Sequence, residues 1–138
     1  MNTVDKQSII QDFLKYVVEE LGIESLPKIH LIYDHSFAKS HRSFGVYRPE
    51  HKELYVYVGD RNMADVLRTF AHELVHHRQH EIGMEMDGGT GSEIENQANS
   101  IAGVLLRTYG KGHEVIYESK YKNKESVKQM INELKKVK

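Results

Sequence analysis

The stretch from Thr69 to Glu81, TFAHELVHHRQHE, holds the residues of this chain whose types and spacing point most directly to chemistry. Its core is H-E-x-x-H, and on an α-helix His72 and His76 lie on one face about one turn apart, so both imidazoles can bind one metal ion. Neutral imidazoles suit zinc, and a catalytic zinc site has three protein ligands and keeps its fourth position for water. Glu73 lies about 100° around the helix from His72, where its carboxylate reaches that water rather than the ion. The motif indicates a zinc hydrolase with Glu73 as its base.

The third zinc ligand must come from elsewhere in the chain. Cysteine is absent, so only histidine and carboxylate side chains remain as metal ligands. We expect Glu95 to be this ligand, because it follows a glycine-rich connection, 83–91, that lets a second helix turn back across the first. The alternative ligands near the motif are Glu81, Glu85, Asp87 and Glu93. Glu95 also has an alternative role, since Ser92 to Glu95 fits the S-x-x-E pattern of a helix capping box.

Apolar residues at helical spacing predict the elements that carry these ligands. One stripe predicts a helix over 62–80, capped by Asp60 or Asn62, and a second predicts a helix from Ser92 to Gly110. Two further helices are expected, over 4–21 with Gly22 as its C-cap and over 124–137. At the end of the motif helix, His77 and His80 are expected to be solvated or to interact as imidazolium with the helix C-terminus. The apolar stripe of the motif helix consists of Met63, Val66, Leu67, Phe70, Leu74 and Val75.

The segment between the first helix and the motif helix is rich in strand formers. Residues 28–33 predict a strand, and 34–42 are polar and predict a loop. Residues 43–47 and 53–58 predict an antiparallel hairpin around a turn at Pro49. The length favours one domain over 1–138, and the elements together predict the α+β class.

At these positions the chain resembles the gluzincin metallopeptidases, in which HExxH on one helix is joined by a glutamate from a following helix. The string Glu95-Asn96-Gln97-Ala98-Asn99 is similar to the E-x-x-A-N pattern of compact members, namely the minigluzincins and the related stress-response and phage-repressor-cleaving metallopeptidases. The resemblance covers roughly residues 44–106. It implies that Asn99 supports a zinc ligand and that the strand over 53–58 is an edge strand along which an extended substrate pairs above the zinc.

The resemblance also implies a zincin-like fold, in which a small, mainly antiparallel sheet packs on the HExxH helix and the glutamate helix, with flanking terminal helices. Larger gluzincins stabilise the oxyanion with a downstream His or Tyr. Here Tyr109, His113 and Tyr117 are candidates, and we expect the role to fall to His113 or Tyr117. The apolar face of the helix over 124–137 predicts that it packs on the core. The alternatives are a cover over the cleft, which the resemblance implies because some minigluzincins are latent, and a membrane-surface helix.

Composition limits the partners. The net charge is −1 and the pI about 6.8, so the chain as a whole lacks the positive charge typical of nucleic-acid binding. The first residues do not resemble a secretory signal, and no apolar run is long enough to span a bilayer. We therefore expect a cytoplasmic metallopeptidase, or one in the host cytoplasm if it is viral, with one Zn²⁺ per chain and a peptide or protein substrate. The alternatives are a binding or regulatory protein without turnover and a zinc hydrolase acting on a non-peptide substrate; the oligomeric state stays open.

Overall fold

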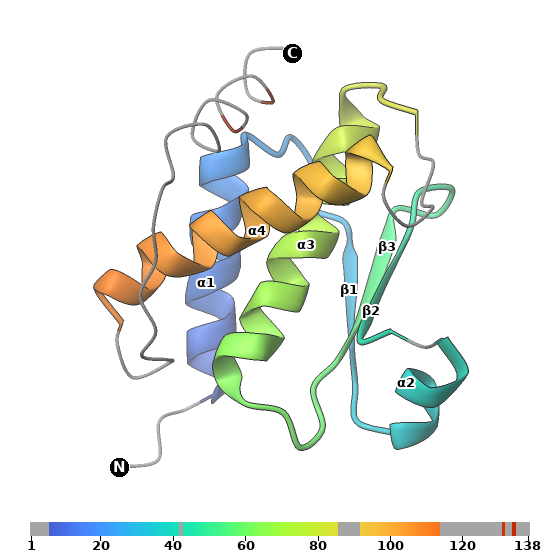
Figure 1. Ribbon diagram of the computed structural model, residues 1–138, viewed down its shortest axis with the longest axis vertical. Coiled ribbons are helices and arrows are strands. Elements are labelled where there is room, and N and C mark those ends of the chain that lie inside the picture. The colour runs from blue at the N-terminus through green and yellow to red at the C-terminus, as the bar shows by residue number, and fades with distance from the viewer. Residues whose placement is uncertain (1–5, 42, 86–91, 114–130, 132–133, 135–138) are drawn as a thin grey trace.

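The computed structural model describes residues 6–41, 43–85, 92–113, 131 and 134. These residues form a mixed α+β fold in which a small sheet packs against helices (Figure 1). The strands are β1 (Lys28–Ile32), β2 (Gly45–Arg48) and β3 (Glu53–Tyr57). The helices are α1 (Lys6–Leu21), α2 (His35–His41), α3 (Met63–Glu81) and α4 (Glu93–Lys111).

The sheet has the strand order β1-β3-β2. β2 and β3 pair antiparallel, which confirms the predicted hairpin. β1 pairs with β3 in parallel, however, so the sheet is mixed and not mainly antiparallel. The reason is that β3 returns from the hairpin turn into the space between β1 and β2. β3 is therefore the central strand, and the prediction that 53–58 forms an edge strand was wrong.

α1 follows the predicted stripe and ends where expected. Gly22 has φ +70°, the left-handed conformation that glycine adopts without a Cβ penalty. Its amide donates to the carbonyl of Glu19, and the amide of Ile23 donates to that of Val18. This pair of bonds is a Schellman motif, which satisfies carbonyl groups left over at the helix end.

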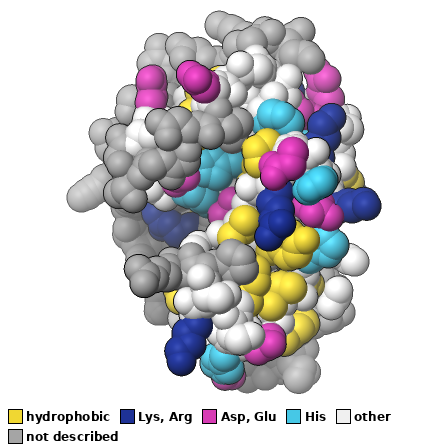
Figure 2. Space-filling model, turned by 90° about the vertical axis from the view of Figure 1, so that its right-hand side faces the viewer, with side chains coloured by type: hydrophobic (Ala, Val, Ile, Leu, Met, Phe, Trp, Pro, Cys, Tyr) yellow, Lys and Arg dark blue, Asp and Glu magenta, His cyan; other side chains and the backbone are white. Residues whose placement is uncertain are grey.

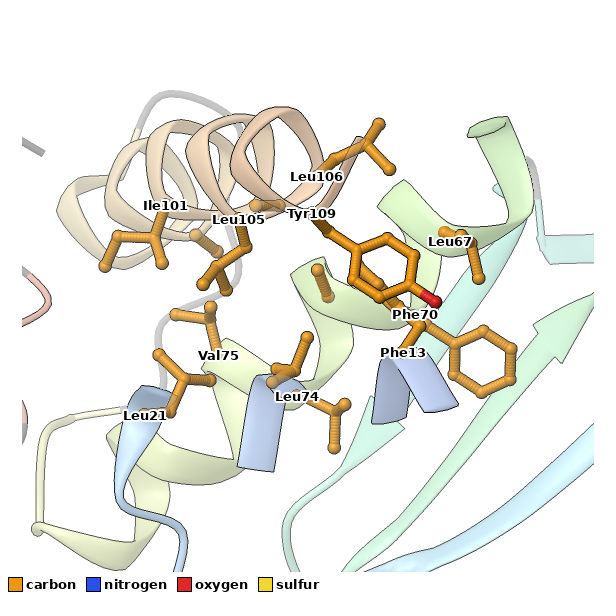
Figure 3. Packing of buried hydrophobic residues seen from close by; sticks show 14 of the residues in the cluster. Phe13, Leu21, Leu67, Phe70, Leu74, Val75, Ile101, Leu105, Leu106 and Tyr109 are labelled. Atoms are coloured by element: carbon orange, nitrogen blue, oxygen red, sulfur yellow. The ribbon is translucent and has the colours of Figure 1, made fainter. Parts of the chain in front are cut away.

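The core lies between the sheet and the three long helices, with α4 crossing α3 and α1 (Figures 1 and 3). Leu67, Phe70 and Leu74 of α3 are fully buried, as the predicted stripe requires. Ile101 and Leu105 of α4 belong to the same core cluster and lie above Val75 of α3 in Figure 3. α3 is thus covered on one side by the sheet and on another by α4, which fixes the direction of its polar face.

α2 replaces the loop predicted for 34–42. Its start is stabilised by Asp34, whose carboxylate accepts a hydrogen bond from the amide of Ser36 at 3.0 Å. Phe37 then stacks on Tyr55, which also stacks on His30, on the sheet face away from α1 and α3. A single apolar anchor is too short a pattern to predict a helix from sequence periodicity.

The expected C-terminal helix, 124–137, lies outside the described residues except at two positions. Ile131 and Leu134 are helical, buried and part of the main core. Arg78 of α3 donates from Nη2 to the carbonyl oxygen of Leu134 at 3.1 Å. At these two positions the C-terminal segment therefore contributes to the core. Within the described part of the chain, no helix combines the length and apolarity needed to cross a membrane.

Candidate metal centre

The histidines of the motif present their rings side by side near the middle of α3. The ring centroids of His72 and His76 are 4.7 Å apart, and the planes of the two rings are nearly perpendicular. His76 is buried and His72 partly buried. Their position follows from the core stripe, because burying Phe70 and Leu74 turns the two imidazoles toward the cleft between α4 and the sheet.

Glu95 reaches both histidines from the first turn of α4. Its Oε1 lies 3.1 Å from Nε2 of His72, and its Oε2 lies 3.0 Å from Nε2 of His76. Ser92 is the N-cap of α4 and accepts a hydrogen bond from the Glu95 amide at 3.3 Å. The structure thus shows the serine half of the predicted capping box, whereas the Glu95 carboxylate, which a complete box would direct to the Ser92 amide, faces the imidazoles.

Gln79, a residue that the sequence did not single out, fixes the tautomer of His76. The Gln79 amide nitrogen donates to the carbonyl oxygen of Ile94 at 3.1 Å, and a carbonyl can only accept, so the Gln79 Oε1 must be the atom 2.8 Å from His76 Nδ1. His76 Nδ1 therefore carries the proton. Its Nε2 is the ring nitrogen that faces Glu95, 3.0 Å from Oε2.

His72 is held in the form that binds metals. Burial, followed by the influence of His76, lowers the pKa of His72 below its ordinary value although Glu95 acts in the opposite direction. The neutral imidazole that a metal requires is therefore favoured. Asn99, one turn after Glu95 on α4, hydrogen-bonds to the His72 side chain, which is the contact that the resemblance implies.

The three side chains fit a zinc ion by their chemistry and their spacing. One donor atom from each of His72, His76 and Glu95 lies within 4.8 Å of the others. Ligand atoms about 2.0 to 2.2 Å from a tetrahedral ion are about 3.4 Å apart, which is compatible with the 4.8 Å limit that these donor atoms satisfy. A lone pair of His76 Nε2 facing a carboxylate oxygen is repulsive unless a proton or a cation lies between them. The donor set therefore suits a divalent cation.

Glu73 lies beside this group and is almost completely buried. Burial, reinforced by the negative charge of Glu95, raises the pKa of Glu73 to about 8 in the metal-free protein. The carboxylate packs under Gly45 of β2, where an added Cβ would lie 2.8 Å from Glu73 Oε2. Gly45 therefore leaves the space that the Glu73 side chain occupies.

A cleft of about 230 Å³ opens above these residues. Its floor is His72, Glu73, His76 and Glu95, and its walls are Ser43, Gly45, Val46, Tyr47, Pro49 and Ile94. The strand along the cleft is thus β2, an edge of the sheet, and not the predicted strand β3. Figure 2, which views the molecule from the sheet side, shows histidine and acidic side chains next to one another on this face.

Of the candidate oxyanion residues, His113 and Tyr109 are described, and neither joins this site. His113 follows the C-terminal end of α4, roughly 25 Å along the helix axis from Glu95. Its ring stacks on Tyr109 with centroids 3.9 Å apart, and its Nε2 lies 3.7 Å from Asp12 of α1. The Tyr109 hydroxyl donates to Asp12 at 2.7 Å. His113 and Tyr109 therefore connect α4 to α1, and Tyr117 lies outside the described residues.

His77 was predicted to be solvated and is instead fully buried. Its Nε2–H donates to the carbonyl oxygen of Ser25 at 2.8 Å, so its Nδ1 accepts from the Tyr47 hydroxyl, also at 2.8 Å. His80 is partly buried, with its Nδ1 3.3 Å from the same hydroxyl. These contacts join α3 to the edge strand β2 and to the loop before β1, which a solvated helix end would not do.

The alternative third ligands lie away from the histidine pair or outside the described residues. Glu81 accepts hydrogen bonds from the amides of Glu24 and Ser25 and pairs with Arg78. Glu85 and Glu93 are exposed. Asp87 lies outside the described residues. Glu95 is the acidic residue of the described structure that completes the histidine group.

Sequence reasoning missed Gln79, Gly45 and Tyr47. Gln79 had a usable signal, because a polar residue three positions after a ligand histidine lies close to the same helix face. For Gly45 and Tyr47 the signal was absent, since their roles depend on which edge of the sheet borders α3. No protein-family model, curated protein or solved structure matches this chain.

Proposed function

We propose that this chain is a zinc-dependent metallopeptidase with a zincin-like fold of the gluzincin kind. The observation that carries the proposal is the convergence of His72, His76 and Glu95 within 4.8 Å beside the buried carboxylate of Glu73, on the floor of an open cleft. A structural metal site has no use for a carboxylate held next to the ligands. A hydrolytic site needs one, as a base for water.

The protein residues have distinct roles in this mechanism. His72, His76 and Glu95 hold the ion, which when bound supplies positive charge to polarise a water molecule and a substrate carbonyl. Glu73 accepts a proton from the attacking water and delivers it to the departing amine nitrogen. The cation would oppose the influences that raise the pKa of Glu73, so the carboxylate would be ionised and able to act as a base near neutral pH.

The position of β2 supports a peptide as the substrate. An edge strand offers backbone N–H and C=O groups with which an extended chain can pair. β2 follows the cleft from Gly45, above Glu73, to Tyr47, beside His77. The backbone of a peptide paired with β2 would therefore extend past the metal ligands.

Zinc content and turnover test the proposal separately. After zinc reconstitution we expect about one zinc per chain, and a loss of that zinc in His72→Ala but not in His51→Ala, which removes an exposed histidine from the hairpin turn. Glu73→Gln keeps all three ligands and should still bind zinc. Its turnover should fall by about 10² to 10⁴, the usual contribution of general acid-base catalysis.

The substrate is found by profiling cleavage of a cell-lysate proteome with the zinc-loaded protein, with Glu73→Gln as the blank. Peptide ends generated by the parent and absent from the blank support the metallopeptidase. If the reconstituted protein contains no zinc, the metal site is wrong. If zinc is bound but parent and blank give the same ends, the chain is a binding protein or acts on a non-peptide substrate.

A further inference from the structure

The side-chain amide of Gln79 lies where each of its polar atoms needs a hydrogen-bond partner within the protein. Its side chain is fully buried between α3 and α4. A buried amide must satisfy both its N–H groups and its oxygen, or its burial is costly. Here the nitrogen donates to Ile94 O at 3.1 Å and to Gln97 Oε1 at 2.8 Å, and the oxygen accepts from His76. Every hydrogen of the amide therefore has an acceptor.

These contacts join two ligands that stand on different helices. One end of the amide holds His76 on α3, and the other holds the turn of α4 formed by Ile94 and Gln97, on either side of Glu95. His76 Nδ1–H is used by Gln79, so Nε2 is left as the metal-facing atom. The same side chain thus fixes the tautomer of His76 and also contacts the turn that carries Glu95.

We propose that Gln79 is a positioning residue that orients His76 to bind the metal before the metal arrives. The inference rests on the proposed zinc site and adds to it a determinant of affinity outside the ligand set. Partners of this kind orient the ring and raise the basicity of the ligand nitrogen, and their loss costs about 10- to 100-fold in metal affinity.

Gln79 also has a purely structural interpretation, as a polar contact that holds α3 against α4. The two roles differ in what the amide must supply. Positioning requires the acceptor that faces His76, whereas helix contact requires the donors that face Ile94 and Gln97. Variants that separate acceptor from donors therefore separate the roles.

Three variants provide this separation. Gln79→Leu removes acceptor and donors. Gln79→Glu keeps an acceptor for His76 but places an oxygen against the Ile94 carbonyl, so it should lower the melting temperature of the metal-free protein. Gln97→Leu, the matched control, removes one partner of the Gln79 nitrogen and leaves the contact with His76 intact.

Zinc affinity is measured by competition with a chromogenic chelator at a temperature where each metal-free variant is folded, and metal-free melting is measured alongside. We expect Gln79→Leu to bind zinc about 10- to 100-fold more weakly, and Gln79→Glu and Gln97→Leu to stay within about threefold of the parent. Parent-like affinity in Gln79→Leu overturns the inference. So does an affinity that falls in step with melting temperature in all three variants.

Two further experimental outcomes also distinguish the roles. If Gln79→Leu does not fold, Gln79→Met, which removes the acceptor and the donors with little change of shape, carries the test: a loss of zinc affinity of about tenfold or more supports positioning, and parent-like affinity overturns it. If the parent itself does not bind zinc, the proposed function fails. If instead the parent and all the variants bind zinc equally well, the proposed zinc site stands and the inference about Gln79 fails.

Discussion

Replacing Gly45 by alanine would test whether the position of Glu73 determines turnover. The new Cβ would lie 2.6 Å from Thr69 Cγ2, 2.8 Å from Glu73 Oε2 and 3.1 Å from Glu73 Cγ. The first two separations are shorter than a Cβ tolerates. The Glu73 oxygen would have to retreat by about 0.6 Å to reach an ordinary contact of 3.4 Å, or β2 would have to lift from α3.

The expected effects on stability and on turnover differ in size. Overpacking costs about 1 to 3 kcal/mol, and alanine recovers about 0.5 to 1 kcal/mol relative to glycine in a strand, so the net loss is between about 0 and 2.5 kcal/mol. A catalytic group displaced by about 1 Å can cost about 100-fold in rate. We therefore expect kcat to fall by about 10- to 100-fold in a protein that still folds. Zinc affinity should be unchanged, because none of the close contacts involves a ligand.

The assay compares zinc stoichiometry, thermal melting and peptide hydrolysis in Gly45→Ala and in Gly112→Ala. The second variant is the control, since an added Cβ at Gly112 has no neighbour within 4 Å. Parent-like kcat in Gly45→Ala would refute the role given to the Glu73 position. Loss of zinc from Gly45→Ala would show that the whole strand and helix had separated, which the contact distances do not predict.

Two other predictions concern stability. In the metal-free protein the raised pKa of Glu73, about 8 against an ordinary 4.5, means that the unfolded chain releases a proton between these pH values while the folded chain keeps it. Stability should therefore fall as pH rises from 4.5 to 8, by up to about 1.4 kcal/mol per pH unit, and urea titrations of Glu73→Gln should lack this component. Leu134→Ala should cost about 2 to 5 kcal/mol, because the side chain is buried in the main core. A variant with unchanged unfolding and higher peptidase activity would instead favour a C-terminal segment that covers the cleft.

The features that the sequence predicted are those set by local spacing. The stripe of α3, the stop at Gly22 and the facing of His72 and His76 depend on residues within one or two helical turns. Glu95 was predicted over a longer distance because it follows a glycine-rich connection, 83–91, that lets a second helix turn back. Its approach to the histidines needed only that α4 turn back across α3.

The features that were missed depend on which segments meet in space. His77 looked like a solvated residue at a helix end, and it is buried because the loop at Ser25 and the hydroxyl of Tyr47 close over it. The resemblance implied that β3 is an edge strand, and the hairpin pattern could not correct this because it does not state which of its strands pairs with β1. Apolar periodicity describes one element at a time and carries no information on strand order.

The polar side chains in the last turns of α3 imply an order in which the molecule assembles. His76 and Glu95 are 19 positions apart, whereas the contacts of Tyr47 with His77, His77 with Ser25 and Arg78 with Leu134 join residues 30, 52 and 56 positions apart. Closing a longer loop costs more entropy, and that cost is met before the contact is gained. We therefore expect the α3–α4 hairpin to bring the ligands together first and the distant contacts to lock afterwards. A zinc ion captured at that stage would serve as a folding nucleus, and amide exchange pulsed during refolding with and without zinc would register the difference.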